Sequence, residues 1–347
     1  MVQWQSLQNR LRGILSHPAN QRLAQSIFAT AAPEAIGALL NAFCRAELGG
    51  AITACRFSYL RVGGTFIVQL TTGQTCVIKA YGLDQDESSV QACLTSQDWL
   101  ARSGFPCPSV LAGPQRVSST LLSAQDYVPG SDADGFHLSA PQSPQIRCAM
   151  ARGLAQLLQT TQHNVCPPGI QPWLLAGPDQ LWPTPHNILI NFQQTATGAD
   201  WIDAIAQQAQ LRLLETPGHL ILGHSDWSYQ NMAFDGEQLV CVYDWDALRI
   251  GQEAWFVGGA ARCFNQDWRQ GPPQEGITVA EAQAFIHAYE EERGRSFSVA
   301  EQRMVGAALV YAAAYGTRCA HQGNQPETLF SQRMKAQLHA FAAHFLD

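Results

Sequence analysis

The spacing of apolar residues predicts helices in the first fifty residues of the chain. Apolar side chains recur at helical intervals in two runs, Trp4, Leu7, Leu11 and Ile14, then Ile36, Leu39, Leu40 and Phe43. Gly49-Gly50 ends this segment, because paired glycines break a regular helix. We therefore expect a helical N-terminal extension over residues 1–50.

Residues 51–81 show a different pattern, in which apolar and polar residues tend to alternate. This period of two, broken at Gly63-Gly64 and Thr72-Gly73, predicts three antiparallel strands. A helical pattern follows over residues 86–103, and residues 117–122 are typical of a further strand. The sequence thus predicts a small β-rich lobe.

After Tyr127-Val128-Pro129-Gly130 the helical patterns become long, which marks the expected lobe boundary. The predicted helices span residues 144–162, 283–292 and 299–318. The fold class is α+β, with a helical extension (1–50), an N-terminal lobe (51–128) and a mainly helical C-terminal lobe (129–347).

Composition excludes several classes of protein. Hydrophobic residues make up 46% of the 347 residues and charged residues 14%, which favours a folded globule over a disordered chain. The net charge of −7, without a basic cluster, argues against a nucleic-acid partner. No signal peptide and no apolar run of about 20 residues is present, so we expect no membrane partner and a cytoplasmic location. None of the ten cysteines forms a C-x-x-C pair, which indicates packed, reduced thiols.

The segment 220–246 carries the strongest chemical pattern. Its Asp-Gly turn lies between two apolar runs and predicts a hairpin. Closing the hairpin across residues 235–238 places Asn231 opposite Val242, with Asp244 two residues further along the same face. Diagonal neighbours on one face lie about 7–8 Å apart, a gap that an amide oxygen and a carboxylate can close around one divalent cation. Asn231 and Asp244 are therefore candidate Mg²⁺ ligands.

Asp226 precedes the hairpin, in a turn from which its carboxylate can project toward the same site. The pattern His224-x-Asp226-x-x-x-x-Asn231, followed by Asp244-Trp-Asp, resembles the catalytic and metal loops of protein kinases and, more closely, of the aminoglycoside phosphotransferase and choline kinase superfamily. The resemblance implies Asp226 as catalytic base, Asn231 and Asp244 as Mg²⁺ ligands, and His224 as a brace of the loop. The alternative is an ordinary loop with solvated carboxylates.

Lys79 is one of only two lysines in the chain and lies in the apolar run Thr75-Cys-Val-Ile-Lys-Ala-Tyr81. In a strand, Val77, Lys79 and Tyr81 share one face. Because burying an unpaired ammonium is costly, Lys79 needs an anion, and a nucleotide phosphate is suitable. An edge-strand lysine that discourages aggregation is the alternative.

The same resemblance assigns a nucleotide site. It implies that Lys79 holds the α- and β-phosphates of ATP, that Val77 packs on adenine, and that backbone groups near Asp126, Tyr127 and Val128 meet the adenine edge. Gly63 and Gly64 would let the backbone approach the phosphates, although a plain hairpin turn explains them nearly as well.

Three departures from the family pattern stand out. The helix glutamate that pairs with the strand lysine is absent, because Cys93 occupies its position, and the nearby candidates are Glu87, Gln91 and Gln97. Gln230 replaces a frequent glycine, and Val257 stands where an aspartate is common.

The sequence as a whole predicts an ATP-dependent kinase that phosphorylates a hydroxyl group of a small molecule, with ATP and Mg²⁺ as cofactors. The acceptor and the oligomeric state are left open, although six acidic positions could favour a cationic acceptor: Asp132, Asp134, Asp200, Asp203, Asp246 and Glu253. Two rival interpretations are a non-catalytic kinase-like nucleotide-binding or scaffold protein, which the missing glutamate suggests, and a hydrolase. Trp227 stands where a hydrolase nucleophile elbow needs glycine.

Overall fold

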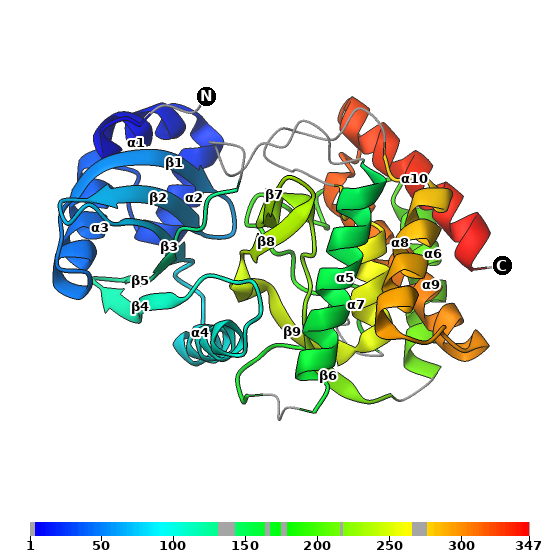
Figure 1. Ribbon diagram of the computed structural model, residues 1–347. Helices are drawn as coiled ribbons and strands as arrows, with labels where there is room; N and C mark the ends of the chain where they lie inside the picture. The colour runs from blue at the N-terminus through cyan, green and yellow to red at the C-terminus, as the bar shows by residue number, and fades with distance from the viewer. Residues whose placement is uncertain are drawn as a thin grey trace. The chain divides into compact units, whose positions relative to one another are not determined.

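A computed structural model describes residues 4–130, 143–163, 167–174, 179–215, 218–265 and 276–346. The chain divides into two compact units. The first contains Met1–Gly135 together with His186–Leu189, and the second contains Phe136–Pro185 together with Ile190–Asp347. The fold is α+β, as predicted, and its elements are shown in Figure 1.

The first unit contains a five-stranded antiparallel sheet of order β1-β2-β3-β5-β4. Its strands are β1 (Ile52–Leu60), β2 (Gly64–Leu70), β3 (Thr75–Tyr81), β4 (Val110–Val117) and β5 (Thr120–Asp126). The three strands predicted before residue 81 are therefore confirmed. The prediction of one strand over 117–122 was wrong, because a turn at Ser118, whose φ is 54°, joins two separate strands there.

Helices cover both faces of this sheet (Figure 1). The helices are α1 (Leu7–Leu15), α2 (Pro18–Phe28), α3 (Pro33–Glu47) and α4 (Glu87–Arg102). The first three share one apolar core with Cys76, Ile78 and Ala80, whereas α4 packs on the opposite face, against Tyr81. Trp4 lies before α1 and is 41% exposed, so it is not part of the predicted helical stripe. The predicted extension thus forms a helical layer on the sheet.

The second unit combines short strands with long helices. Its strands form two pairs, β6 with β9 and β7 with β8. Their bounds are β6 (Leu220–His224), β7 (Met232–Asp235), β8 (Gln238–Val242) and β9 (Leu248–Gln252). The helices are α5 (Pro144–Thr161), α6 (Asp200–Glu215), α7 (Glu253–Ala261), α8 (Val279–Arg293), α9 (Val299–Ala320) and α10 (Leu329–Phe345). The structure confirms α5, α8 and α9 and adds three helices that the sequence analysis did not assign.

Within the described ranges, no single helix is long and apolar enough to cross a membrane, and α2 with α3 reaches that length and composition only as a bent pair. All nine described cysteines are free. Burial raises the pKa of Cys76 to about 12, so this thiol stays protonated near neutral pH, in agreement with the predicted packed thiols.

Candidate active site

The candidate catalytic residues lie in two loops of the second unit, which connect β6 to β7 and β8 to β9. The hairpin register differs by one residue from the prediction, since Met232 rather than Asn231 pairs with Val242. The backbone N–H of Tyr243 donates to the carbonyl oxygen of Asn231 at 2.7 Å, so these two residues face each other. An irregularity in β8 causes the shift: Ala233 pairs with Cys241 and Phe234 with Leu239, so Val240 is an extra residue, whereas turn spacing alone assumes continuous pairing.

Backbone and side-chain hydrogen bonds hold the two loops together. The N–H and Oγ–H groups of Ser225 both donate to the carbonyl oxygen of Ala247, at 2.9 Å each. The Asn231–Tyr243 bond ties the other ends of the loops. Because hydrogen bonds join the two loops at both ends, Asp226 and Asp244 are held on one scaffold.

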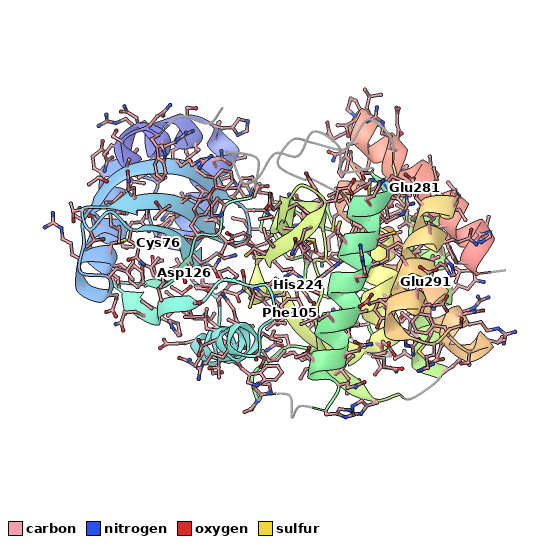
Figure 2. The ribbon with its side chains drawn as sticks, viewed as in Figure 1. Cys76, Phe105, Asp126, His224, Glu281 and Glu291 are labelled. Carbon is pink, nitrogen blue, oxygen red and sulfur yellow. The ribbon has the colours of Figure 1, made fainter. Side chains whose placement is uncertain are left out.

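His224, the last residue of β6, connects the two loops and is labelled in Figure 2. The backbone N–H of Asp226 donates to its Nδ1 at 3.2 Å, so the ring proton is on Nε2, which donates to the carbonyl oxygen of Tyr243 at 3.0 Å. Trp227 and Trp245 contact the ring edge to face, with centroids 5.8 and 5.5 Å away. His224 is 1% exposed, and this geometry supports a role as brace of both loops.

Burial lowers the pKa of His224, although the nearby carboxylates Asp226, Asp244 and Asp246 oppose the shift. The lowered pKa favours the neutral imidazole in the folded protein, and below its ordinary pKa of 6.5 the ring takes up a proton when the chain unfolds. A neutral ring is the form that both hydrogen bonds require.

We expect the free energy of unfolding to fall as the pH drops below about 6.5, because the unfolded chain then binds a proton that folded His224 excludes. A His224→Asn variant lacks this titration and should lose less stability between pH 7 and pH 5. Urea unfolding of both proteins at several pH values measures the difference. Equal pH dependence would contradict a buried neutral His224.

Asp226 is half-buried, and its carboxylate accepts hydrogen bonds from neutral donors. Ser228 Oγ–H donates to Oδ1 at 3.2 Å, and Asn231 Nδ2–H donates to Oδ2 at 3.0 Å. Gln230, the residue in place of the family's glycine, also reaches Oδ2, at 3.5 Å. These contacts fix the orientation of the carboxylate. Because all three donors are neutral, they leave its negative charge in place for an incoming group.

The same contacts determine which atom of Asn231 can hold a cation. Its amide nitrogen faces Asp226, so the amide oxygen of the planar group points away from that carboxylate. An amide oxygen and a carboxylate are hard oxygen ligands, which suit Mg²⁺. Asn231 and Asp244 thus provide a suitable donor set for an ion that also binds phosphates and water.

Asp244 occupies a special backbone position. Its φ of 68° and ψ of 44° are left-handed, a conformation that aspartate and asparagine tolerate better than most residues. β8 ends at Val242, and a 3₁₀ turn (Trp245–Ala247) follows, anchored where Trp245 Nε1–H donates to the carbonyl oxygen of Val242 at 2.7 Å. The half-buried carboxylate of Asp244 is therefore at a fixed end of the hairpin.

Packing behind the loops keeps them in place. Trp227 Nε1–H donates to the carbonyl oxygen of Met150 in α5 at 3.0 Å, and the N–H of Tyr229 donates to that of Phe264 at 2.8 Å. Gly223 has no room for a side chain, because a Cβ there would lie 2.6 Å from the Phe256 ring. The loop that carries Asp226 is thus bound to α5 and to the segment after α7.

In the first unit, Lys79 is 8% exposed and lies on the sheet face that α4 covers. It pairs with Thr65 of β2 and Ser123 of β5, so β3 is an inner strand. The edge-strand alternative is therefore wrong. The predicted face of Val77, Lys79 and Tyr81 agrees with the position of Cys76, Ile78 and Ala80 in the opposite core.

The remaining predicted nucleotide residues also belong to the first unit. A Cβ on Gly63 would lie 2.5 Å from the carbonyl oxygen of Ala80, so a close approach to β3 requires this glycine. Gly64 begins β2 opposite Leu60, which is a hairpin position. Asp126 ends β5, and its backbone N–H donates to the carbonyl oxygen of Ser109 at 3.0 Å. Tyr127 and Val128 follow as half-buried residues outside any strand or helix.

The candidate partners of Lys79 on α4 have different roles. Glu87 forms an exposed ion pair with Arg116 at 3.1 Å, and Gln91 bonds to Thr95 on the same helix. Cys93 is buried. Gln97 is also buried and bonds to Gln125 of β5, a residue that the sequence analysis missed. The signal for Gln125 was a polar residue two positions from Ser123, which puts both on one face of the strand Thr120–Asp126.

Two of the acidic positions suggested for a cationic acceptor have internal partners. Glu253 accepts from Tyr289 Oη–H at 2.6 Å and from Arg293 at 2.8 Å. Asp203 accepts from Trp182 Nε1–H at 2.9 Å and lies 3.5 Å from the Arg318 guanidinium. Asp200 is exposed in the first turn of α6 and Asp246 is half-buried, whereas Asp132 and Asp134 lie outside the described residues. Val257 is fully buried in α7, which explains an apolar residue there.

Comparison with known proteins gives a family match. The profile described as "Phosphotransferase enzyme family" matches residues 62–297, more than half of the chain and including both candidate loops. No curated protein matches the sequence.

Solved structures are similar in fold. An amicoumacin kinase in complex with AMP-PNP, Ca²⁺ and Ami has a TM-score of 0.62 at 13% identity, covering 84% of this chain and 88% of that one. A microcompartment-associated aminopropanol kinase has a TM-score of 0.60 at 16% identity, covering 83% and 90%. A Thermobifida fusca protein named as a candidate fructosamine-3-kinase has a TM-score of 0.53 at 16% identity, covering 88% of this chain and 98% of that one. At these identities the similarity establishes a shared fold.

Proposed function

Because the chain belongs to the phosphotransferase enzyme family, as its resemblance predicted, we propose that it transfers the γ-phosphoryl group of ATP to a hydroxyl group of a small molecule. The main support is the pair of bonded loops that carries Asp226, Asn231 and Asp244 on one scaffold. The kinase folds of the solved relatives support the same class of reaction.

In this proposal Asp226 orients the acceptor hydroxyl and takes up its proton. The hydroxyl oxygen forms a bond to the γ-phosphorus, while the bond from that phosphorus to the bridging oxygen breaks and ADP leaves. Asn231 and Asp244 would hold Mg²⁺, which supplies neutralisation of phosphate charge when bound. Lys79 would bind the α- and β-phosphates, Val77 would pack on adenine, and the backbone near Asp126, Tyr127 and Val128 would meet its edge.

For the acceptor we propose a chemical class and not a single compound. The solved relatives include kinases named for amicoumacin and for aminopropanol, and the second name suggests a hydroxyl-bearing amine. Among the described acidic candidates, Asp203 and Glu253 are engaged by internal donors, and the exposed Asp200 is the first position to test for a cationic acceptor. A cytoplasmic location and the absence of nucleic-acid and membrane partners stay predictions.

We expect ATP with Mg²⁺ to raise the thermal unfolding temperature, because a ligand that binds only the folded state stabilises it by mass action. At about a hundred times Kd the gain is about 2.7 kcal/mol. Thermal shift assays with ATP and Mg²⁺, with ATP and a chelator, and with Mg²⁺ alone separate the contributions. ADP formation is then measured against a panel of amino alcohols, aminoglycosides and sugars.

The two candidate functions give different results in this experiment. A small-molecule kinase shows Mg²⁺-dependent stabilisation and acceptor-dependent ADP release. A non-catalytic nucleotide-binding protein, which the lack of a carboxylate at Cys93 would favour, shows stabilisation without turnover for any acceptor. Absence of both responses would contradict the proposed function.

A further inference from the structure

The face of the sheet that carries Lys79 makes two separate contacts with α4. Across β3 and β5, Lys79 pairs with Ser123, Val77 with Gln125, and Tyr81 with Leu121. The first contact is apolar and lies at the Tyr81–Leu121 pair, where α4 packs its side chains Val90 and Leu94.

The second contact is polar and lies at the Val77–Gln125 pair. Gln97, one turn further along α4 than Cys93, donates from Nε2 to Gln125 Oε1 and to the carbonyl oxygen of Pro108, both at 2.8 Å. Gln97 is 1% exposed and Gln125 is 5% exposed, so water competes little for these bonds. The pair of Lys79 with Ser123, called the Lys79 row below, therefore lies between the apolar contact and the amide contact.

Ser123, opposite Lys79, is also fixed. Its Oγ lies 2.9 Å from Tyr81 Oη, and both side chains are buried. The stem of Lys79 is confined by burial, since the residue is 8% exposed, and its strand partner Ser123 is held by a hydrogen bond. An ammonium on a confined stem loses less conformational entropy when it binds a ligand.

The carboxylates of the five strands and of α4 are directed elsewhere. Asp126 is the only one on these strands, and it pairs with Cys76, on the side of α1 to α3. The two carboxylates of α4 form ion pairs with arginines, Glu87 with Arg116 and Asp98 with Arg102. Neither α4 nor the sheet therefore supplies a carboxylate to the Lys79 row.

We propose that the Gln97–Gln125 amide pair positions Lys79, in place of an ion pair with a helix carboxylate. The pair fixes α4 to β5 beside the lysine while adding no negative charge, so the pair itself does not weaken the attraction of the ammonium for an anionic ligand. This inference rests on the proposed function, because that ligand is the nucleotide phosphate. Gln97 and Gln125 are positioning residues and do not contact the nucleotide.

The test uses Gln97→Met and Gln125→Met, which keep side-chain volume and remove the amide. Each variant should raise the KM for ATP about fivefold, the effect of one lost hydrogen bond, while kcat at saturating ATP and the KM for the acceptor stay near wild type. The double variant should have a KM for ATP no higher than that of the more affected single variant, because both changes remove the same Gln97–Gln125 hydrogen bond. Gln91→Met, the same change on the exposed side of α4, is the matched control and should leave all constants unchanged.

A purely structural role gives a different result. The variants would then unfold at lower temperature, yet their KM for ATP, measured well below that temperature, would equal the wild-type value, and the inference would be overturned. If Gln97→Met fails to fold, Gln125→Met alone decides the question, since Gln97 keeps its bond to Pro108. Wild-type protein that neither binds nor turns over ATP would overturn the proposed function itself, whereas active wild type with unaltered variants overturns only the inference.

Discussion

Asp226→Asn is expected to lower kcat by a factor on the order of a hundred or more while leaving the affinity for ATP and Mg²⁺ near the wild-type value. The variant keeps the shape of the side chain and removes the proton acceptor. Ser228 Oγ–H can still donate to the amide oxygen, so the loop retains one of its bonds to this residue. Steady-state kinetics with an accepted hydroxyl compound, together with nucleotide titration by calorimetry, measures both quantities.

The matched control is Asp235→Asn, the same chemical change at an exposed position at the end of β7. It should leave kcat and nucleotide affinity unchanged. If Asp226→Asn lost nucleotide binding and kept its turnover at saturating ATP, the assignment of Asp226 as base would be wrong. A decrease in kcat equal to that of the control would also contradict it.

The face assignments around Lys79 were predictable because a strand has a strict period of two. Once 75–81 is recognised as a strand, Val77, Lys79 and Tyr81 must share a face. The sequence does not reveal which helices cover each face. That Cys76, Ile78 and Ala80 meet α1 to α3, and Tyr81 meets α4, depends on tertiary packing.

The hairpin register was predicted less well, for a reason specific to hairpins. An Asp-Gly turn locates the hairpin, but one extra residue in β8, Val240, moves the pairing by one and places Asn231 opposite Tyr243. The candidate pair Asn231 and Asp244 still lies in two loops that hydrogen bonds join. At Asp244 the left-handed backbone ends the strand's alternation of faces, so the position of its side chain no longer follows from the register. No periodic pattern encodes that single conformation.

On α4, the absence of the family's glutamate does not reveal which residue takes its place or what that residue contacts. The sequence identified Cys93 at the position of the family's glutamate and named Gln97 as one possible substitute. The partner of Gln97 lies 28 residues away on β5, and only the fold brings Gln125 next to it. Short-range spacing predicts the faces of elements, whereas pairs of this kind depend on how elements pack.

Asp244→Asn is expected to weaken both Mg²⁺-dependent nucleotide binding and phosphoryl transfer, which distinguishes it from Asp226→Asn. The change removes the negative charge of the proposed metal ligand and keeps a residue that tolerates the left-handed backbone at φ 68°. Alanine would add backbone strain to the loss of charge, so asparagine is the sharper variant. Titration of ATP at several Mg²⁺ concentrations should show that the variant needs at least about tenfold more Mg²⁺ to reach half-maximal activity.

The matched control is Asp246→Asn, a carboxylate of the same Asp-Trp-Asp triplet that also lies near enough to His224 to affect its pKa. Since Asp246 is not a proposed ligand, its variant should keep the wild-type Mg²⁺ dependence of nucleotide binding, even if acceptor affinity changes. A general loss of negative charge around the loops would affect the two variants equally. If Asp244 is a specific metal ligand, the Mg²⁺ concentration for half-maximal activity rises for Asp244→Asn alone. Equal rises in both variants would rule out Asp244 as the ligand.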